Sequence, residues 1–256
     1  MRMKLKCDKV LNWNKKNILS LNGDRRRGKT RMKKLTGKLF KALATMLMIV
    51  MLFSIAAPLA SACHDPSHDE EVYSDSHGHW AYWYIGWAMQ NGISTGFADG
   101  TFRPNVSVTR AEFVTFLHRV AGRPEANAEA EFPDMPRTAV FREAISWAVE
   151  AGVTTGFDDG TFRPNSRIHR QQIAAMLFRY ADSLELSTVA PEGELDRFND
   201  DYEVADWAEE EMRWAVYQGL ITGQRGGFLA PRNNATRAET VTMLQRFVAT
   251  FEIELP

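Results

Sequence analysis

Three arginines occupy matching places in this sequence: each follows a glycine by 14 residues and a tryptophan by 23 residues. The arginines are Arg110, Arg170 and Arg237, the glycines are Gly96, Gly156 and Gly223, and the tryptophans are Trp87, Trp147 and Trp214. Each arginine takes the first position of a predicted helix, where the positive end of the helix dipole disfavours a cation by up to about 1 kcal/mol. Free backbone N–H groups, that dipole and a guanidinium fork together suit a carboxylate or a phosphate. The three positions therefore predict anion binding.

An alternative stays open for these arginines, in which each one pairs with an acid of the neighbouring unit and only fixes packing. A second recurring set lies near the ends of the same helices, at Arg119, Arg179 and Arg246. Because a cation stabilises a helix C-terminus, we assign this second set to structure.

The constant spacing defines three copies of one unit, over residues 73–122, 132–182 and 198–250. Each copy is predicted to form a helix, a loop and a second helix. In the first copy, one apolar stripe of the first helix is formed by Trp80, Trp83, Tyr84, Trp87 and Ala88. A glycine that can end this helix follows in every copy. Because one pair of helices cannot bury both of its apolar faces, the three copies must share a core, which predicts an all-α fold.

The second helix of each copy has a signal for its start. The first and third copies fit the capping box, in which a threonine and a glutamate three residues later satisfy each other's backbone N–H groups (Thr109–Glu112 and Thr236–Glu239). The second copy has His169 and Gln172 at these places, so it keeps only the glutamine half of the box. In the first two copies the preceding loop carries an Asp-Gly pair, which favours a tight turn over a calcium site.

The first 62 residues predict a secretory signal peptide. Residues 1–41 carry 15 basic and two acidic side chains, residues 42–62 carry no charge, and Ala60-Ser61-Ala62 forms a small-x-small cleavage site. A start at Met32 would give a signal of ordinary length, and a retained membrane anchor is the alternative. Since the basic segment would be removed, we expect no nucleic-acid partner. The sequence after residue 41 carries 16 basic and 30 acidic side chains, a net charge of −14.

Residues 63–72 are predicted to form a tether rich in histidine and acid. Cys63 would be the first exported residue, and it is either a lipid-attachment site or a free thiol. Four histidines, which suit zinc or copper, lie in or near the tether at His64, His68, His77 and His79. Their spacing matches no firm metal-site pattern, so we expect no metal there.

The sequence contains no recognisable catalytic motif. No nucleophile motif occurs, and the many carboxylates are scattered as on a solvated acidic surface. We therefore expect neither enzymatic activity nor a cofactor.

The segment Phe97–Asn105 followed by Val108–Glu112 closely resembles the S-layer homology motif, and so do Phe157–Asn165 and Ala235–Glu239. The resemblance covers nearly all of residues 73–250. It implies a pseudo-three-fold, all-helical prism with a central helical bundle, which holds secreted proteins and S-layers to the bacterial cell surface. The implied ligand is a secondary cell-wall polysaccharide, often bearing pyruvate ketals, bound in grooves between repeats.

The arginine of the family's Thr-Arg-Ala-Glu motif is its key ligand contact, a role that carries over to the three arginines above. The supporting loop and helix-start residues are Gly96, Gly156, Gly223, Thr109 and Thr236. Two departures stand out. The second copy has the histidine and glutamine described above, and the third loop, 224–231, lacks the aromatic residue and Asp of the first two. The third site is therefore the one least like the family pattern.

Two other functions stay open. One is a lipoprotein or adaptor that an acyl chain on Cys63 tethers to the membrane and that links a partner, such as an S-layer or other surface protein, to the wall. The other is a metal-binding surface protein that uses the N-terminal histidines. In the main interpretation the protein is secreted and stays at the bacterial cell wall, with membrane contact only through its signal peptide or a lipid anchor.

Overall fold

A computed structural model describes residues 73–255 of the chain. The predicted signal peptide (1–62), the tether (63–72), Cys63, His64 and His68 lie outside these described residues. No helix within 73–255 is long and apolar enough to cross a membrane.

The described part of the chain is helical, as predicted. The first repeat contains α3 (Tyr82–Gln90) and α4 (Arg110–Val120), the second α5 (Ala139–Glu150) and α6 (Arg170–Ser183), and the third α7 (Glu209–Tyr217) and α8 (Arg237–Thr250). Two 3₁₀ turns, η1 (Asp201–Glu203) and η2 (Asp206–Ala208), precede α7. Between 73 and 255 the only β pairing consists of isolated bridges, so the all-α prediction is confirmed.

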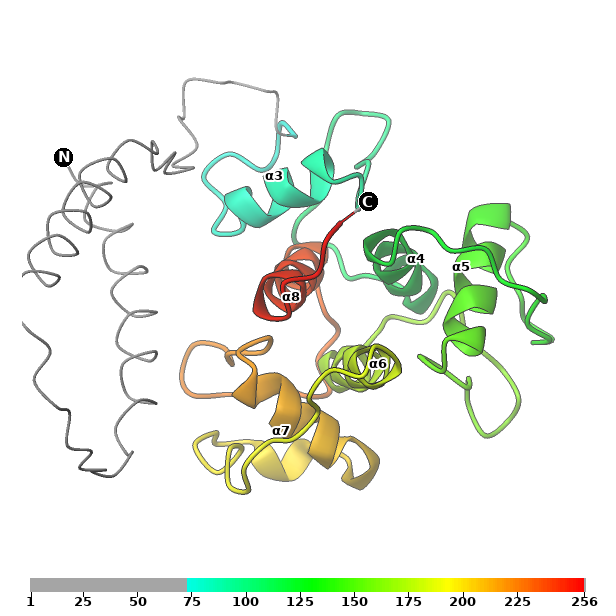
Figure 1. Ribbon diagram of the computed structural model, residues 1–256. Coiled ribbons are helices and arrows are strands. Elements are labelled where there is room, and N and C mark those ends of the chain that lie inside the picture. Colours follow the sequence, from blue (N-terminus) through cyan, green and yellow to red (C-terminus); the bar gives the residue numbers. More distant parts are fainter. Residues whose placement is uncertain (1–72, 256) are drawn as a thin grey trace, which may run out of the picture. The chain divides into compact units, whose positions relative to one another are not determined.

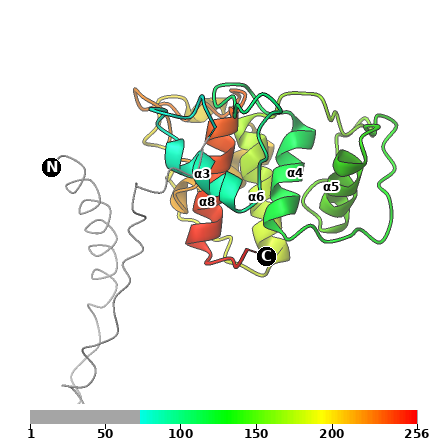
Figure 2. The ribbon, with the colours of Figure 1, turned by 90° about the horizontal axis from the view of Figure 1, so that it is seen from above.

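The second helices α4, α6 and α8 form a central bundle, and the first helices surround it (Figures 1 and 2). Each outer helix packs mainly on the second helix of the preceding repeat: α5 on α4, α7 on α6, and α3 on α8. The contact between α3 and α8 joins the first repeat to the last and closes the ring. The two helices of one repeat therefore pack mainly on helices of neighbouring repeats and not on each other. In this way three units that cannot bury their apolar faces alone share one core.

A ring of backbone hydrogen bonds at one end of the bundle repeats this three-fold pattern. The Val108 N–H donates to the Ala235 carbonyl (2.9 Å), Ala235 to Ile168 (2.9 Å), and Ile168 to Val108 (3.0 Å). These residues each lie two positions before a second helix, so the ring fixes where all three helices begin.

The core uses the predicted apolar faces of the second helices, including Phe113, Leu177 and Phe247, which are fully buried. The predicted stripe of the first helix is wrong in its first half, because Trp80 and Trp83 are each 59% exposed. Trp80 precedes α3, and the residues that α3 buries are Ile85, Gly86 and Ala88, of which only Ala88 belongs to the predicted stripe.

An aspartate near the start of each repeat, which the sequence interpretation missed, holds that repeat's loop. Asp134 accepts hydrogen bonds from the backbone N–H groups of Phe162 (2.9 Å) and Arg163 (2.7 Å). Asp75 and Asp200 bind the first and third loops in the same way. Arg163 has a φ of 58°, a left-handed conformation that costs a non-glycine residue free energy. The aspartate offsets that cost and positions the loop.

We expect Asp134→Ala to lower the free energy of unfolding by about 2–4 kcal/mol, because it removes two hydrogen bonds to a charged acceptor. Asp134→Asn keeps one acceptor oxygen and should cost less. Urea unfolding measures both, with Asp182→Ala on an exposed face of α6 as a control that should change stability by no more than about 0.5 kcal/mol. Equal effects of Asp134→Ala and Asp182→Ala would show that the clamp does not stabilise the fold.

Candidate functional site

Each of the three predicted arginines crosses to the loop of the next repeat. The Nε of Arg110 donates to the Phe162 carbonyl (2.8 Å), that of Arg170 to Leu229 (3.1 Å), and that of Arg237 to Phe102 (2.7 Å). All three arginines are buried. A change in one loop therefore affects the arginine of the preceding repeat. The unusual third loop faces Arg170 and not Arg237, which corrects our assignment of that departure to the third arginine.

The backbone N–H groups at the helix starts are not free, so our expectation that they would bind the anion is wrong. The Arg110 N–H donates to the Ser166 carbonyl (2.9 Å), and the Ala111 N–H donates to Pro164 (3.1 Å). The Glu112 N–H donates to the Thr109 hydroxyl (3.2 Å). The loop carbonyls of neighbouring repeats bind the first two N–H groups of α6 and α8 in the same way. The guanidinium groups remain as the candidates for anion binding.

One groove, which we call the Arg110 groove, lies between repeats and has a volume of about 350 Å³. The first repeat contributes Arg110, the second contributes its loop and one side of α6, and the third contributes Trp207 of η2. Its lining residues are Arg110, Thr154, Thr155, Gly156, Phe157, Asp158, Gln172, Ala175, Met176, Arg179 and Trp207.

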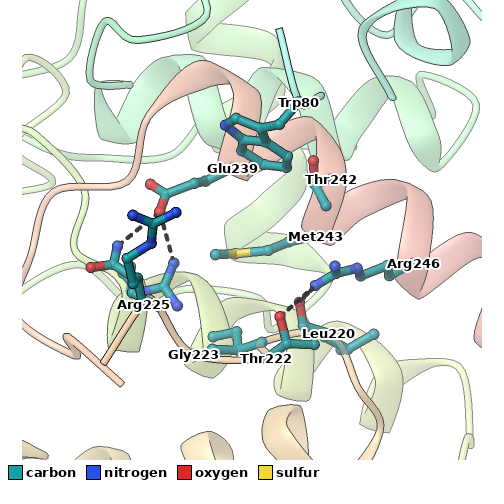
Figure 3. Close-up of a pocket in the computed structure, with 12 residues that line it drawn as sticks. Trp80, Leu220, Thr222, Gly223, Arg225, Glu239, Thr242, Met243 and Arg246 are labelled. Carbon is teal, nitrogen blue, oxygen red and sulfur yellow. Dashed lines mark hydrogen bonds and ion pairs between the residues drawn. The ribbon is translucent and has the colours of Figure 1, made fainter. Parts of the chain in front are cut away.

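A second groove, the Arg170 groove, has the same construction one repeat further on and a volume of about 540 Å³. Figure 3 shows Trp80 across this groove from Gly223 and Thr222, with Met243 between them. Arg246 donates to the Leu220 carbonyl (3.3 Å) and the Thr222 hydroxyl (3.4 Å). The lining residues are Trp80, Arg170, Leu220, Ile221, Thr222, Gly223, Gln224, Arg225, Glu239, Thr242, Met243 and Arg246.

The sequence interpretation did not place a tryptophan at either groove, and it assigned Trp80 to an apolar stripe. Trp80 and Trp207 each precede the recurring tryptophan of their repeat by seven residues, and they are 59% and 52% exposed. The second repeat has Val140 at this position. The matching spacing of Trp80 and Trp207 was the signal in the sequence that could have identified them as a pair. By contrast, Trp147 and Trp214 are buried.

The packing interpretation of the arginines is met at two of the three positions. Arg170 forms an ion pair with Glu239 (3.1 Å), and Arg237 lies 3.7 Å from a Glu112 oxygen. In both cases the acid belongs to the next repeat, as the packing alternative required. Arg110 has no ion pair with any described residue, and its guanidinium lies 4.5 Å and 4.8 Å from the ring centres of Phe157 and Phe162.

The influences on the pKa also differ between Arg110 and Arg170. Burial lowers the pKa of Arg110 to about 10, repulsion from Arg163 and Arg179 adds to this effect, and Asp134 opposes it. Burial also lowers the pKa of Arg170, where Glu239 is the main opposing influence. Arg110 remains charged at neutral pH, so it is a buried cation that no acid of residues 73–255 pairs with.

The supporting residues lie where the sequence predicted. Gly156 has a φ of 80°, and a side chain there would place its Cβ 2.5 Å from the Phe132 ring. Gly96 and Gly223 have φ of 62° and 77° and press against aromatic rings in the same way. Thr109 and Thr236 complete capping boxes at α4 and α8.

The two described histidines of the proposed metal cluster have other contacts. The His79 Nε2 lies 3.2 Å from the Asn105 side-chain oxygen, and the His77 ring packs against Tyr82. Within residues 73–255 no group of three or more metal-ligating side chains is assembled. The Asp-Gly loops are turns, because Asp99 and Asp159 each accept hydrogen bonds from the threonine two residues later.

Comparison with known proteins agrees with this architecture. The S-layer homology domain matches residues 72–114, 131–174 and 197–241, which are the three repeats. An endoglucanase of Bacillus sp. (strain KSM-635) is 32% identical over 206 residues, 80% of this chain and 22% of that protein. S-layer protein EA1 of Bacillus anthracis is 27% identical over 209 residues, which cover the same shares of the two chains. A cellulosome-anchoring protein of Acetivibrio thermocellus is 26% identical over 161 residues, 59% of this chain and 34% of that one.

This chain thus spans about a fifth to a third of these relatives. Three matched repeats, together with the ring of helices that they form, show that the chain belongs to the S-layer homology domain family and is a bacterial cell-surface protein.

Proposed function

We propose that the three repeats attach the protein non-covalently to an anionic secondary cell-wall polysaccharide, with a sugar-borne carboxylate such as a pyruvate ketal as the bound group. The observation that carries this proposal is the Arg110 groove. It presents a buried, charged guanidinium that has no acidic partner in the described part of the chain, and an exposed tryptophan lines the same groove. A guanidinium fork binds a carboxylate through two parallel hydrogen bonds. The face of Trp207 supplies an apolar surface for the sugar ring.

The repeated construction of the two grooves supports a polymeric ligand. A polysaccharide that carries the same acidic group at intervals can occupy the Arg110 groove and the Arg170 groove together. The second contact then forms at a high effective concentration, which raises the overall affinity without a new contact. The predicted net charge of −14 after residue 41 repels a polyanion at long range, so we propose that attraction arises only inside the grooves.

We also propose that the protein does not cleave its ligand. A glycoside hydrolase needs two carboxyl groups facing each other across the scissile bond. The Arg110 groove contains one carboxylate, Asp158, and the Arg170 groove contains one, Glu239. Zymography on purified walls should therefore show no clearing at the position of the protein.

The proposal is tested by co-sedimentation of the full-length protein with purified cell walls. We expect the protein to pellet with intact walls and to remain in the supernatant after hydrofluoric acid has stripped the secondary polysaccharide from the peptidoglycan. Equal pelleting with stripped walls would show that the polysaccharide is not the ligand. That result would favour the alternative of an adaptor that an acyl chain on Cys63 tethers to the membrane.

A further inference from the structure

In two of the three repeats the glutamate of the capping box has a second task. One oxygen of Glu239 accepts a hydrogen bond from the Thr236 N–H (2.9 Å), while the other pairs with Arg170 (3.1 Å). Glu112 accepts from the Thr109 N–H (2.7 Å) with one oxygen and lies 3.7 Å from Arg237 with the other. The glutamate therefore caps its own helix and partly neutralises the arginine of the preceding repeat.

The second repeat keeps the capping role but not the neutralising role, because it has Gln172 in place of the glutamate. The Gln172 side-chain oxygen accepts a hydrogen bond from the His169 N–H (3.0 Å), so the cap is kept. A neutral amide cannot balance the charge of Arg110. Arg110 is only 3% exposed, and removing a guanidinium from water without a counter-charge costs free energy that an incoming anion would recover.

A second arginine in the same groove also differs from its counterparts in the other repeats. Arg119 and Arg246 donate to the carbonyls of Ile93 and Leu220. Arg179, at the equivalent position of α6, has no such hydrogen bond to any described residue and lines the Arg110 groove. Asp158 is the one acid among the lining residues, and it forms no ion pair with Arg110 or Arg179. The groove therefore offers two cations to a ligand.

We infer that the side chain at the position of Gln172 decides which groove takes a carboxylate most strongly, and that the Arg110 groove is the primary anion site of this chain. The inference rests on the proposed function and adds an order of affinity to its grooves. The Arg170 groove keeps Arg225 and Arg246, so it still attracts an anion. Its buried guanidinium is already paired, and a ligand carboxylate bound there must approach Glu239, which has the same charge.

The two tryptophans make the grooves separately observable. The indole N–H signal of Trp207 reports on the Arg110 groove and that of Trp80 on the Arg170 groove. The probe is a methyl hexoside bearing a 4,6-pyruvate ketal, titrated into the full-length protein and followed by NMR. Its methyl ester serves as the uncharged control. Trp80→Phe and Trp207→Phe assign the two signals.

We expect half-saturation at Trp207 at about one-tenth of the ketal concentration needed at Trp80, because a charge pair held partly away from water is worth about a factor of ten. Gln172→Glu should raise the concentration needed at Trp207 about tenfold and leave Trp80 unchanged. Glu239→Gln should lower the concentration needed at Trp80 by a similar factor. Both replacements keep the oxygen that caps the helix. Glu112→Gln makes the same charge change beside Arg237 and should affect neither signal.

Half-saturation that is the same at both tryptophans and insensitive to Gln172→Glu and Glu239→Gln would overturn the inference while leaving groove binding intact. Failure of both signals to respond to the ketal, together with unchanged wall binding after loss of Arg110 and Arg170, would remove the proposed function as well.

Discussion

Replacing Arg110 and Arg170 together by alanine should abolish co-sedimentation with purified cell walls. The double variant removes the buried guanidinium from both described grooves. Deleting one charged partner of a buried ligand contact costs about 2–5 kcal/mol, which is a loss of thirtyfold or more for each groove. Since binding through two grooves multiplies their effects, the loss should exceed the range of a sedimentation assay. The fraction pelleted at increasing wall concentration measures it.

Two controls separate lost binding from lost structure. Arg142→Ala with Arg197→Ala changes the net charge by the same amount, and it breaks ion pairs with Glu129 and Glu194 and a contact with the Phe198 ring, none of which lines either groove. This control should pellet like the wild type. Circular dichroism should show unchanged helicity for both double variants, because neither arginine pair supplies the apolar core. Full wall binding by the Arg110 and Arg170 variant would exclude the arginine mechanism.

Gly156→Ala should lower the free energy of unfolding and weaken ligand binding at the Arg110 groove. Gly160→Ala, four residues later, should have a smaller effect on stability and leave binding unchanged. Both glycines have positive φ, 80° and 76°, so both alanines cost about 1 kcal/mol of backbone strain. Only at Gly156 would the new Cβ meet other atoms, at 2.5 Å from Phe132 and 2.8 Å from the Thr161 carbonyl. That overlap should add about 1–3 kcal/mol.

Urea unfolding and wall binding measure the two effects of this pair. Displacing Phe132 also moves Phe162, whose ring packs on Phe132 and lies against the Arg110 guanidinium. We therefore expect Gly156→Ala to weaken wall binding at a temperature where it is still folded, and Gly160→Ala to retain it. Equal free energies of unfolding for the two variants would show that Phe132 and the Thr161 carbonyl can move away from the new Cβ without destabilising the fold.

The repeats, the helices and the recurring glycines and arginines could be predicted from the sequence because they depend on local spacing. The capping boxes at Thr109 and Thr236 are satisfied within four residues, so the sequence alone identifies them. The partners of each arginine could not be predicted, because they depend on how repeats meet. Arg237, for example, bonds to a carbonyl 135 positions earlier in the chain, and no periodicity contains that pairing.

The same limit explains the errors about the helix starts and the tryptophans. The Arg110 N–H is satisfied by Ser166 of the next repeat, whereas a reading of one repeat in isolation leaves it free. Trp80 and Trp83 fit an apolar stripe by spacing, but α3 begins only at Tyr82 and the side chains that it buries include Ile85 and Ala88. Exposure of an apolar residue in an outer helix is decided by the neighbour that the helix meets.

The claim that depends most on the arginines is that they hold a carboxylate of the wall polymer. The direct test is the fraction of full-length protein that pellets with purified walls before and after mild acid has hydrolysed the pyruvate ketals under conditions that leave the polymer in place. The account predicts that the pelleted fraction falls as far after removal of the ketals as it does after removal of the whole polymer. Undiminished pelleting with walls that retain the polymer but carry no ketal would contradict it.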